Sequence, residues 1–206
     1  MNKIFIEAQK ADTSECNFLS TLFARHFPTA EVQFITMHGV DNLFNETNLN
    51  QIRIAADDGD NAIVLLDADS PEKGWGFEKR HQDVVDKMKE NSVSFPFFLY
   101  PNNQDDGDVE VLMESIARKD LHPDWWGCFE DYEMCVKGVH DEEGNARYNI
   151  PDRKAKLHTY IRSQKLSRKA RNNIGSGNWL FDDDRFWDIE SEALNPLLDF
   201  LRKHLS

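Results

Sequence analysis

This sequence of 206 residues is short of cysteine, of long apolar runs and of basic residues. Its three cysteines, Cys16, Cys128 and Cys135, lack the number and spacing of a disulfide framework, so we expect a reduced, cytoplasmic protein. The longest apolar runs, such as residues 62–66 and 95–100, fall far below the ~20 residues of a membrane span. No long apolar segment follows the first methionine, which predicts no signal peptide and no membrane partner.

Lysine and arginine number 24 against 37 aspartates and glutamates, which gives a net charge of −13. This balance argues against nucleic-acid binding through a broad basic surface, because counterion release requires many cations. A bound divalent cation could still turn an acidic pocket into a phosphate site. The 14 phenylalanines and five tryptophans supply enough apolar mass for a core and argue against disorder.

Four strand-like runs separated by helical patterns indicate the fold. The predicted strands are residues 3–6, 32–37, 62–66 and 94–100. Helices are predicted after residues 12–15 and over residues 49–56, 77–90, 108–118 and 152–163. Because residues 62–66 are apolar on both faces, they suit a central strand covered by helices on each side. The pattern predicts an α/β fold with a mainly parallel four-stranded central sheet.

Local signals mark the ends of the chain's helices. Asp12 and Glu15 have the spacing of a capping box, with Asp12 as the N-cap. Asn195 is the predicted N-cap of a C-terminal helix, and Pro196 follows it at the first helical position. That helix carries an apolar leucine stripe. The polar, glycine-containing residues 168–184 predict a surface loop.

The chain divides into a core and an extension. Residues 1–120 hold all the predicted strands, and residues 121–206 are mostly helical or irregular. We expect this helical C-terminal extension to pack on the core within one structural domain.

Three acidic residues stand at the ends of predicted strands. Glu7 follows the first strand, and Asp67 and Asp69 follow the third. Ligands of open parallel sheets bind outside the carboxyl ends of the strands, and side chains at i and i+2 of an extended chain point the same way. These residues are therefore predicted to converge on one Mg²⁺ or Mn²⁺, since carboxylates favour hard cations. The alternative is a solvated acidic loop.

Glu110 follows the fourth strand and is predicted to lie at the same sheet edge as a further metal ligand. The alternative is that Asp108 and Glu110 only complement the dipole of the helix that starts there.

Three lysines are candidate phosphate contacts: Lys73 in the loop after the third strand, and Lys154 and Lys156 in a helix whose solvated face is the alternative. Cys128 and Cys135 have no zinc-finger spacing, and at i and i+7 they predict one buried helix face rather than a zinc site.

The order of these motifs resembles the Toprim domain, in which a Glu follows strand one, a Gly follows strand two and a D-x-D follows strand three. The likeness is closest to a bacterial family of uncharacterised proteins with a Toprim-like core, related to the overcoming-lysogenization-defect nucleases. The matching segments are residues 4–7, 65–69, 97–102, 107–112, 128–130 and 154–160. The resemblance implies a Toprim-like (Rossmann-like) core.

The resemblance also implies roles for the acidic residues. Glu7 matches the general acid or base of Toprim enzymes, and Asp67 and Asp69 match the ligands of Mg²⁺. Ala8 departs from the pattern, because a glycine often follows the Glu and lets a phosphate approach the backbone.

Two hypotheses follow. The first is a Mg²⁺-dependent, nuclease-like enzyme that acts on a phosphodiester, with nucleic acid or a nucleotide held through the metal. The second is a non-catalytic Toprim-like module that binds a nucleotide or a protein and retains relic acids.

Overall fold

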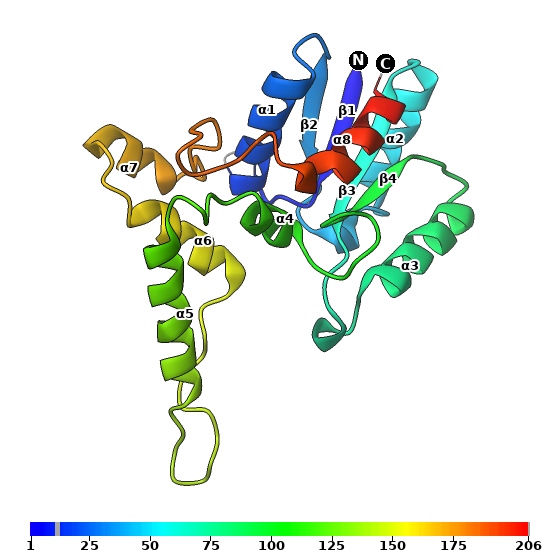
Figure 1. Cartoon of the computed structure of the whole chain (residues 1–206). Coiled ribbons are helices and arrows are strands. Elements are labelled where there is room, and N and C mark those ends of the chain that lie inside the picture. Colours follow the sequence, from blue (N-terminus) through cyan, green and yellow to red (C-terminus); the bar gives the residue numbers. More distant parts are fainter. Residues whose placement is uncertain (11–12, 206) are drawn as a thin grey trace.

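The computed structural model, which describes residues 1–10 and 13–205, has a four-stranded sheet with helices on both faces (Figure 1). The strands are β1 (Asn2–Ile6), β2 (Val32–Thr36), β3 (Asn61–Asp67) and β4 (Phe97–Tyr100). All pairings are parallel, and the strand order is β2-β1-β3-β4. The predicted α/β class is confirmed.

Eight α-helices connect and flank these strands within the described part of the chain. They are α1 (Ser14–His26), α2 (Glu46–Asp57), α3 (Phe77–Glu90), α4 (Val109–Ser115), α5 (Pro123–Lys137), α6 (Arg153–Arg162), α7 (Arg168–Ile174) and α8 (Asn195–His204). Short 3-10 turns cover Val40–Asn42, Pro71–Lys73 and Glu192–Leu194. None of the described helices has the length and apolar character needed to cross a membrane.

Alternation along the strands divides the core into two layers. In β3, Ile63 and Leu65 join the core cluster that contains residues of α1, α4, α6 and α8. Val64 and Leu66 join the opposite cluster, which contains Ile52 of α2 and residues of α3. Burial of both faces explains why this strand is apolar throughout. The cluster containing α6 and α8 also shows that part of residues 121–206 shares a core with the sheet.

The arm formed by α5 and the hairpin after it projects from the body of the molecule (Figure 1). Trp126 is the one buried residue that α5 contributes, and Cys128 and Cys135 are exposed free thiols. The prediction that these cysteines form a buried face is wrong, because α5 buries only Trp126, near its first turn.

Two helix starts differ from the predicted caps. Thr13 is the N-cap of α1, and its hydroxyl accepts a hydrogen bond from the Cys16 N–H at 3.3 Å. Asp12, the predicted cap, lies outside the described residues. At the C-terminal helix, Leu194 takes the N-cap position because a 3-10 turn runs directly into α8, so Asn195 is already helical.

The predicted surface loop over residues 168–184 is partly wrong. Its first part forms α7, and Ile174, Trp179 and Phe181 are buried in the core. The Trp187 Nε1–H donates to the Trp179 carbonyl at 2.8 Å, which fixes the chain after the helix. The three apolar residues are too widely spaced to stand out from their polar neighbours.

The loops after β3 and β4 are bound to each other. The Asp69 N–H donates to the Gly107 carbonyl at 2.6 Å, and the Gly107 N–H donates back to the Asp69 carbonyl at 2.8 Å. Beside this pair, the Asp106 carboxylate accepts from the Phe77 N–H at 2.6 Å and so caps α3 from another loop. The two loops therefore form one rigid edge above the sheet.

Gly107 should not tolerate a side chain. Its φ is +143°, and a Cβ there would lie 2.9 Å from Val111 Cγ2. We expect Gly107→Ala to lower the free energy of unfolding by about 1–3 kcal/mol. Gly127→Ala is the matched control, because Gly127 is helical with open space around it and should gain up to ~1 kcal/mol. Urea denaturation of both variants measures this, and equal effects would contradict the prediction.

Candidate functional site

The candidate site lies between the carboxyl ends of β1 and β3. These strands are neighbours, and the register that pairs Ile6 with Leu65 brings Glu7 beside the end of β3. From β1 the chain first adds β2 on one side, and then crosses over to add β3 on the other side. The direction in which strands are added therefore reverses between β1 and β3. This is the topological switch point at which parallel sheets bind ligands.

Two hydrogen bonds connect the strand ends at this point. Glu7 Oε1 accepts from the Asp67 N–H at 2.8 Å, and Asp67 Oδ1 accepts from the Val109 N–H at 2.8 Å. Val109 is the first residue of α4. Glu7 and Asp67, predicted as partners in one site, are therefore brought together by backbone N–H groups at the end of β3 and the start of α4.

A cavity of about 210 Å³ opens beside these carboxylates. Glu7 and Asp67 line it together with Glu15 of α1, Glu110 of α4 and Lys154 of α6. Lys154 Nζ donates to Glu110 Oε1 at 2.8 Å. The predicted position of Glu110 at this sheet edge agrees with the structure, and one cation faces four carboxyl groups.

Burial raises the proton affinity of this pocket. It raises the pKa of Glu7 to about 7, against the lowering effect of the Asp67 N–H bond and Arg80. The pKa of Glu15 rises to about 8 because of burial and then the charges of Glu7 and Glu110. The pKa of Asp67 also rises well above its usual range through burial and its acidic neighbours. Carboxyl groups with raised pKa values are typical of functional sites.

Asp69 does not face this pocket. Its φ is +60°, so the chain leaves the extended conformation there and the i, i+2 rule behind the predicted convergence fails. Asp69 Oδ2 accepts from Arg80 at 2.8 Å, and Oδ1 accepts from Lys73 at 2.9 Å. The Arg80 guanidinium is 2% exposed and lies 3.7 Å from the centre of the Trp75 ring. Asp69 thus anchors the loop after β3.

The three lysines predicted to contact phosphate have different surroundings. Lys154 lies in the pocket, whereas Lys73 pairs with Asp69, which raises the pKa of the lysine. Lys156 is buried and lies 3.4 Å from a Glu133 oxygen and 3.7 Å from a Glu114 oxygen. That network joins α4, α5 and α6, so neither the predicted phosphate contact nor the solvated-face alternative describes Lys156.

The carboxylate oxygens of the pocket are the ligands that a hard cation prefers, but their present positions do not form a coordination site. Within residues 1–10 and 13–205, no group of three or more His, Cys, Asp or Glu side chains is arranged to hold a metal ion. Glu7 and Asp67 instead accept backbone hydrogen bonds. Next to them the buried Tyr100 hydroxyl has no hydrogen-bond partner in the described structure, so a donor is left unsatisfied.

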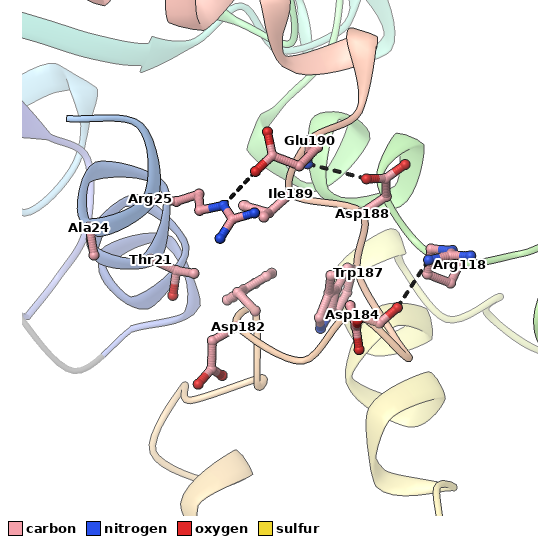
Figure 2. A pocket seen from close by; sticks show the side chains of 11 residues that line it. Thr21, Ala24, Arg25, Arg118, Asp182, Asp184, Trp187, Asp188, Ile189 and Glu190 are labelled. Atoms are coloured by element: carbon pink, nitrogen blue, oxygen red, sulfur yellow. Dashed lines mark hydrogen bonds and ion pairs between the residues drawn. The ribbon is translucent and has the colours of Figure 1, made fainter. Parts of the chain in front are cut away.

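A larger cavity of about 500 Å³ lies over the second half of α1 (Figure 2). Its two arginines are already engaged, Arg25 with Glu190 and Arg118 with the Asp184 carbonyl at 3.1 Å. The smaller pocket is the stronger candidate, since it lies at the switch point and holds carboxyl groups with raised pKa values.

Fold and site together define an α/β protein with an acidic pocket at the switch point of a parallel sheet. A family model described as "Protein of unknown function (DUF3226)" matches residues 12–206. The chain belongs to this family. Neither the curated proteins nor the solved structures compared with it give a match.

Glu15 is the pocket residue that sequence reasoning missed. The sequence predicts it only as half of a capping box, but it is the second residue of α1 and it lines the cavity. Its position could have been found, because the first turn of a helix that follows a strand lies at the carboxyl edge of the sheet.

The raised pKa of Glu15 predicts a pH-dependent stability. A carboxyl group whose pKa rises from 4.5 to about 8 on folding stabilises the folded chain at low pH, and this contribution is lost as the pH rises to about 8. Glu15→Gln should therefore reduce the fall in unfolding free energy between pH 5 and pH 8.5. At pH 8.5 the variant should be more stable than the wild type. Urea denaturation across this range measures it.

The exposed Glu78 of α3 provides the control. Glu78→Gln should follow the wild-type pH profile. Parallel profiles for Glu15→Gln and the wild type would contradict the prediction.

Asp69→Asn should destabilise the fold, because it removes a charged partner from the buried Arg80. We expect a loss of about 2–4 kcal/mol of unfolding free energy. Asp83→Asn breaks a matched pair with the more exposed Lys87 and should cost less than ~1 kcal/mol. Equal losses in urea denaturation would show that Asp69 has no anchoring role.

Proposed function

We propose that this protein is a Mg²⁺-dependent, Toprim-like enzyme that acts on a phosphodiester, most simply a nuclease. The observation that carries the proposal is the meeting of Glu7, Asp67 and Glu110 with Lys154 in one cavity at the switch point. Carboxylates for a divalent cation beside an amine for a phosphate make a set suited to phosphodiester chemistry.

Asp67 and Glu110 are the residues that would hold the cation, since both reach the pocket as hard oxygen donors. Mg²⁺ or Mn²⁺ bound there would neutralise charge that develops on a phosphate. Asp69 belongs to this set only if its pair with Arg80 opens. The unpaired Tyr100 hydroxyl supplies a further donor beside the pocket, and burial keeps it protonated by raising its pKa.

Glu7 is the proposed general acid or base. A pKa of about 7 lets its carboxyl group both take up and release a proton near neutral pH. Its Oε1 is held by the Asp67 N–H, which fixes its direction. Lys154, exposed and paired with Glu110, can turn from the carboxylate to a substrate phosphate.

A second candidate is the non-catalytic binding module. It is favoured by the backbone hydrogen bonds to Glu7 and Asp67, because carboxyl groups that hold loops together can remain without a catalytic role. Ala8 is also buried at the turn where Toprim enzymes often have glycine. Metal binding separates the two candidates.

Saturating Mg²⁺ should raise the melting temperature of the wild type but not of Asp67→Asn. A ligand at about 100 times its dissociation constant adds ~2.7 kcal/mol, which is roughly 5–10 °C for a chain of this size. The melting temperatures should be measured at pH 8.5. The raised pKa values of Glu7 and Asp67 make their carboxyl groups hold protons that compete with the metal at lower pH. In Asp67→Asn the side chain keeps its shape and one oxygen but loses the negative charge that would hold the cation.

Asp57→Asn, at an exposed position of α2, is the matched control and should shift as the wild type does. A metal-dependent hydrolysis assay on a labelled oligonucleotide completes the test, and Glu7→Gln should slow it at least ~100-fold. Equal Mg²⁺ shifts in wild type and Asp67→Asn would eliminate the enzyme proposal.

A further inference from the structure

The basic residues of this acidic chain are unevenly distributed. Residues 153–171 contain eight of the 24 lysines and arginines and no aspartate or glutamate. The rest of the chain has 16 basic residues against 37 acidic ones. A strongly negative net charge therefore conceals one positive segment, which comprises α6, α7 and the turn between them.

The second half of this segment forms an exposed cluster of cations. Its members, which we call the basic cluster, are Arg162, Lys165, Arg168, Lys169 and Arg171. Among the described residues, none of the five has a carboxylate within ion-pair distance. Lys154 and Lys156 in the first half of the segment do have acidic partners. The cluster is thus free to bind an external anion.

An aromatic groove lies beside the cluster. Trp125, Phe129 and Tyr132 of α5 line a cavity of about 320 Å³, and Thr159 of α6 forms its opposite wall. The Trp125 and Phe129 rings stack with centroids 5.1 Å apart. Tyr132 is 48% exposed. Partly exposed rings in series are surfaces on which nucleobases stack.

Helix α6 connects the groove, the cluster and the acidic pocket. Lys154 near its start lines the pocket, and Arg162 at its end belongs to the cluster. At ~1.5 Å per residue these positions are about 12 Å apart along the helix. Thr159 and Arg162 are three residues apart and share a face. Lys154 lies about 140° around the helix from Thr159 at ~100° per residue, so a strand that follows α6 from the cations and aromatic rings would have to turn around it to reach the pocket.

The acidic residues of α5 do not occupy the aromatic face: Glu133, four residues after Phe129, is already paired with Lys156 at 3.4 Å. Glu130 and Asp131 fall on other faces of α5 than Trp125, Phe129 and Tyr132 by helical spacing. The acidic hairpin, residues 138–150, lies at the far end of α5 from α7 (Figure 1).

We propose that the basic cluster and the aromatic groove bind single-stranded nucleic acid and lead it to the acidic pocket. This inference rests on the proposed function, because it assigns the substrate of that site. The cations contact the phosphates, and the rings stack on bases that a duplex would conceal. A second copy of this chain, whose acidic hairpin also complements the cluster, is the competing occupant.

The test is the fluorescence anisotropy of a labelled 20-nucleotide single strand in EDTA, so that binding is measured without the metal. Arg168→Gln/Lys169→Gln/Arg171→Gln should weaken binding at least ~10-fold and reduce the slope of log affinity against log salt by about 2. Arg53→Gln/Lys89→Gln/Lys203→Gln makes the same charge change at exposed helical positions elsewhere and should stay within ~2-fold of the wild type.

Two further variants make the test independent of any defect in α7. Arg162→Gln/Lys165→Gln should also weaken binding, and Tyr132→Ser should weaken it at unchanged salt slope. Circular dichroism checks folding of each variant. A wild type that fails to bind at low salt, equal losses in cluster and control variants, or a duplex bound as tightly as the single strand would overturn the inference.

The failure of this inference is distinct from that of the proposed function. If Mg²⁺ still stabilises wild type over Asp67→Asn while no strand binds, the inference alone falls. If the cluster variant instead abolishes self-association in sedimentation and no strand binds, the second copy is the occupant and the inference is overturned.

Discussion

The hydrogen-bond relay from the Val109 N–H to Asp67, and from the Asp67 N–H to Glu7, is the constraint on which the site depends. It joins the ends of β1 and β3 to the start of α4 through two bonds of 2.8 Å. Since α4 packs on α6, the relay also sets where Glu110 and Lys154 meet. Buried carboxyl groups are costly unless they are hydrogen-bonded or protonated, and this pocket uses both means.

Much of the fold could be predicted because the relevant signals are local and periodic. The apolar run of β3 indicated a strand covered on both faces, and its end located Asp67. Glu7 and Asp67 could be paired because parallel strands share an edge. Asp69 could not be placed, since one residue with positive φ reverses the direction of its side chain. Glu15 could not be assigned to the pocket from its capping pattern, because such a pattern predicts where a helix begins and not which cavity the helix borders.

The net charge of the chain did not reveal the basic cluster, because it sums over the whole surface whereas a ligand contacts one part of it. Several acidic side chains neutralise cations of the extension: Glu114 accepts from Arg153 at 2.9 Å, and Lys156 lies 3.7 Å from Glu114 and 3.4 Å from Glu133. These pairs hold α4, α5 and α6 together while α7 keeps its positive charge. Net charge therefore reports on solubility and not on the field at a particular helix.

The arm of α5 has a consequence for how the protein opens. A helix of 15 residues that buries only Trp126 gains little from the body, so its outer turns can unfold without disturbing the sheet. Amide hydrogens there should exchange with solvent sooner than those of β1 and β3. The hairpin beyond it, closed by the Arg147 N–H on the Val139 carbonyl at 3.0 Å, is accordingly a place where a label or an inserted domain would be tolerated.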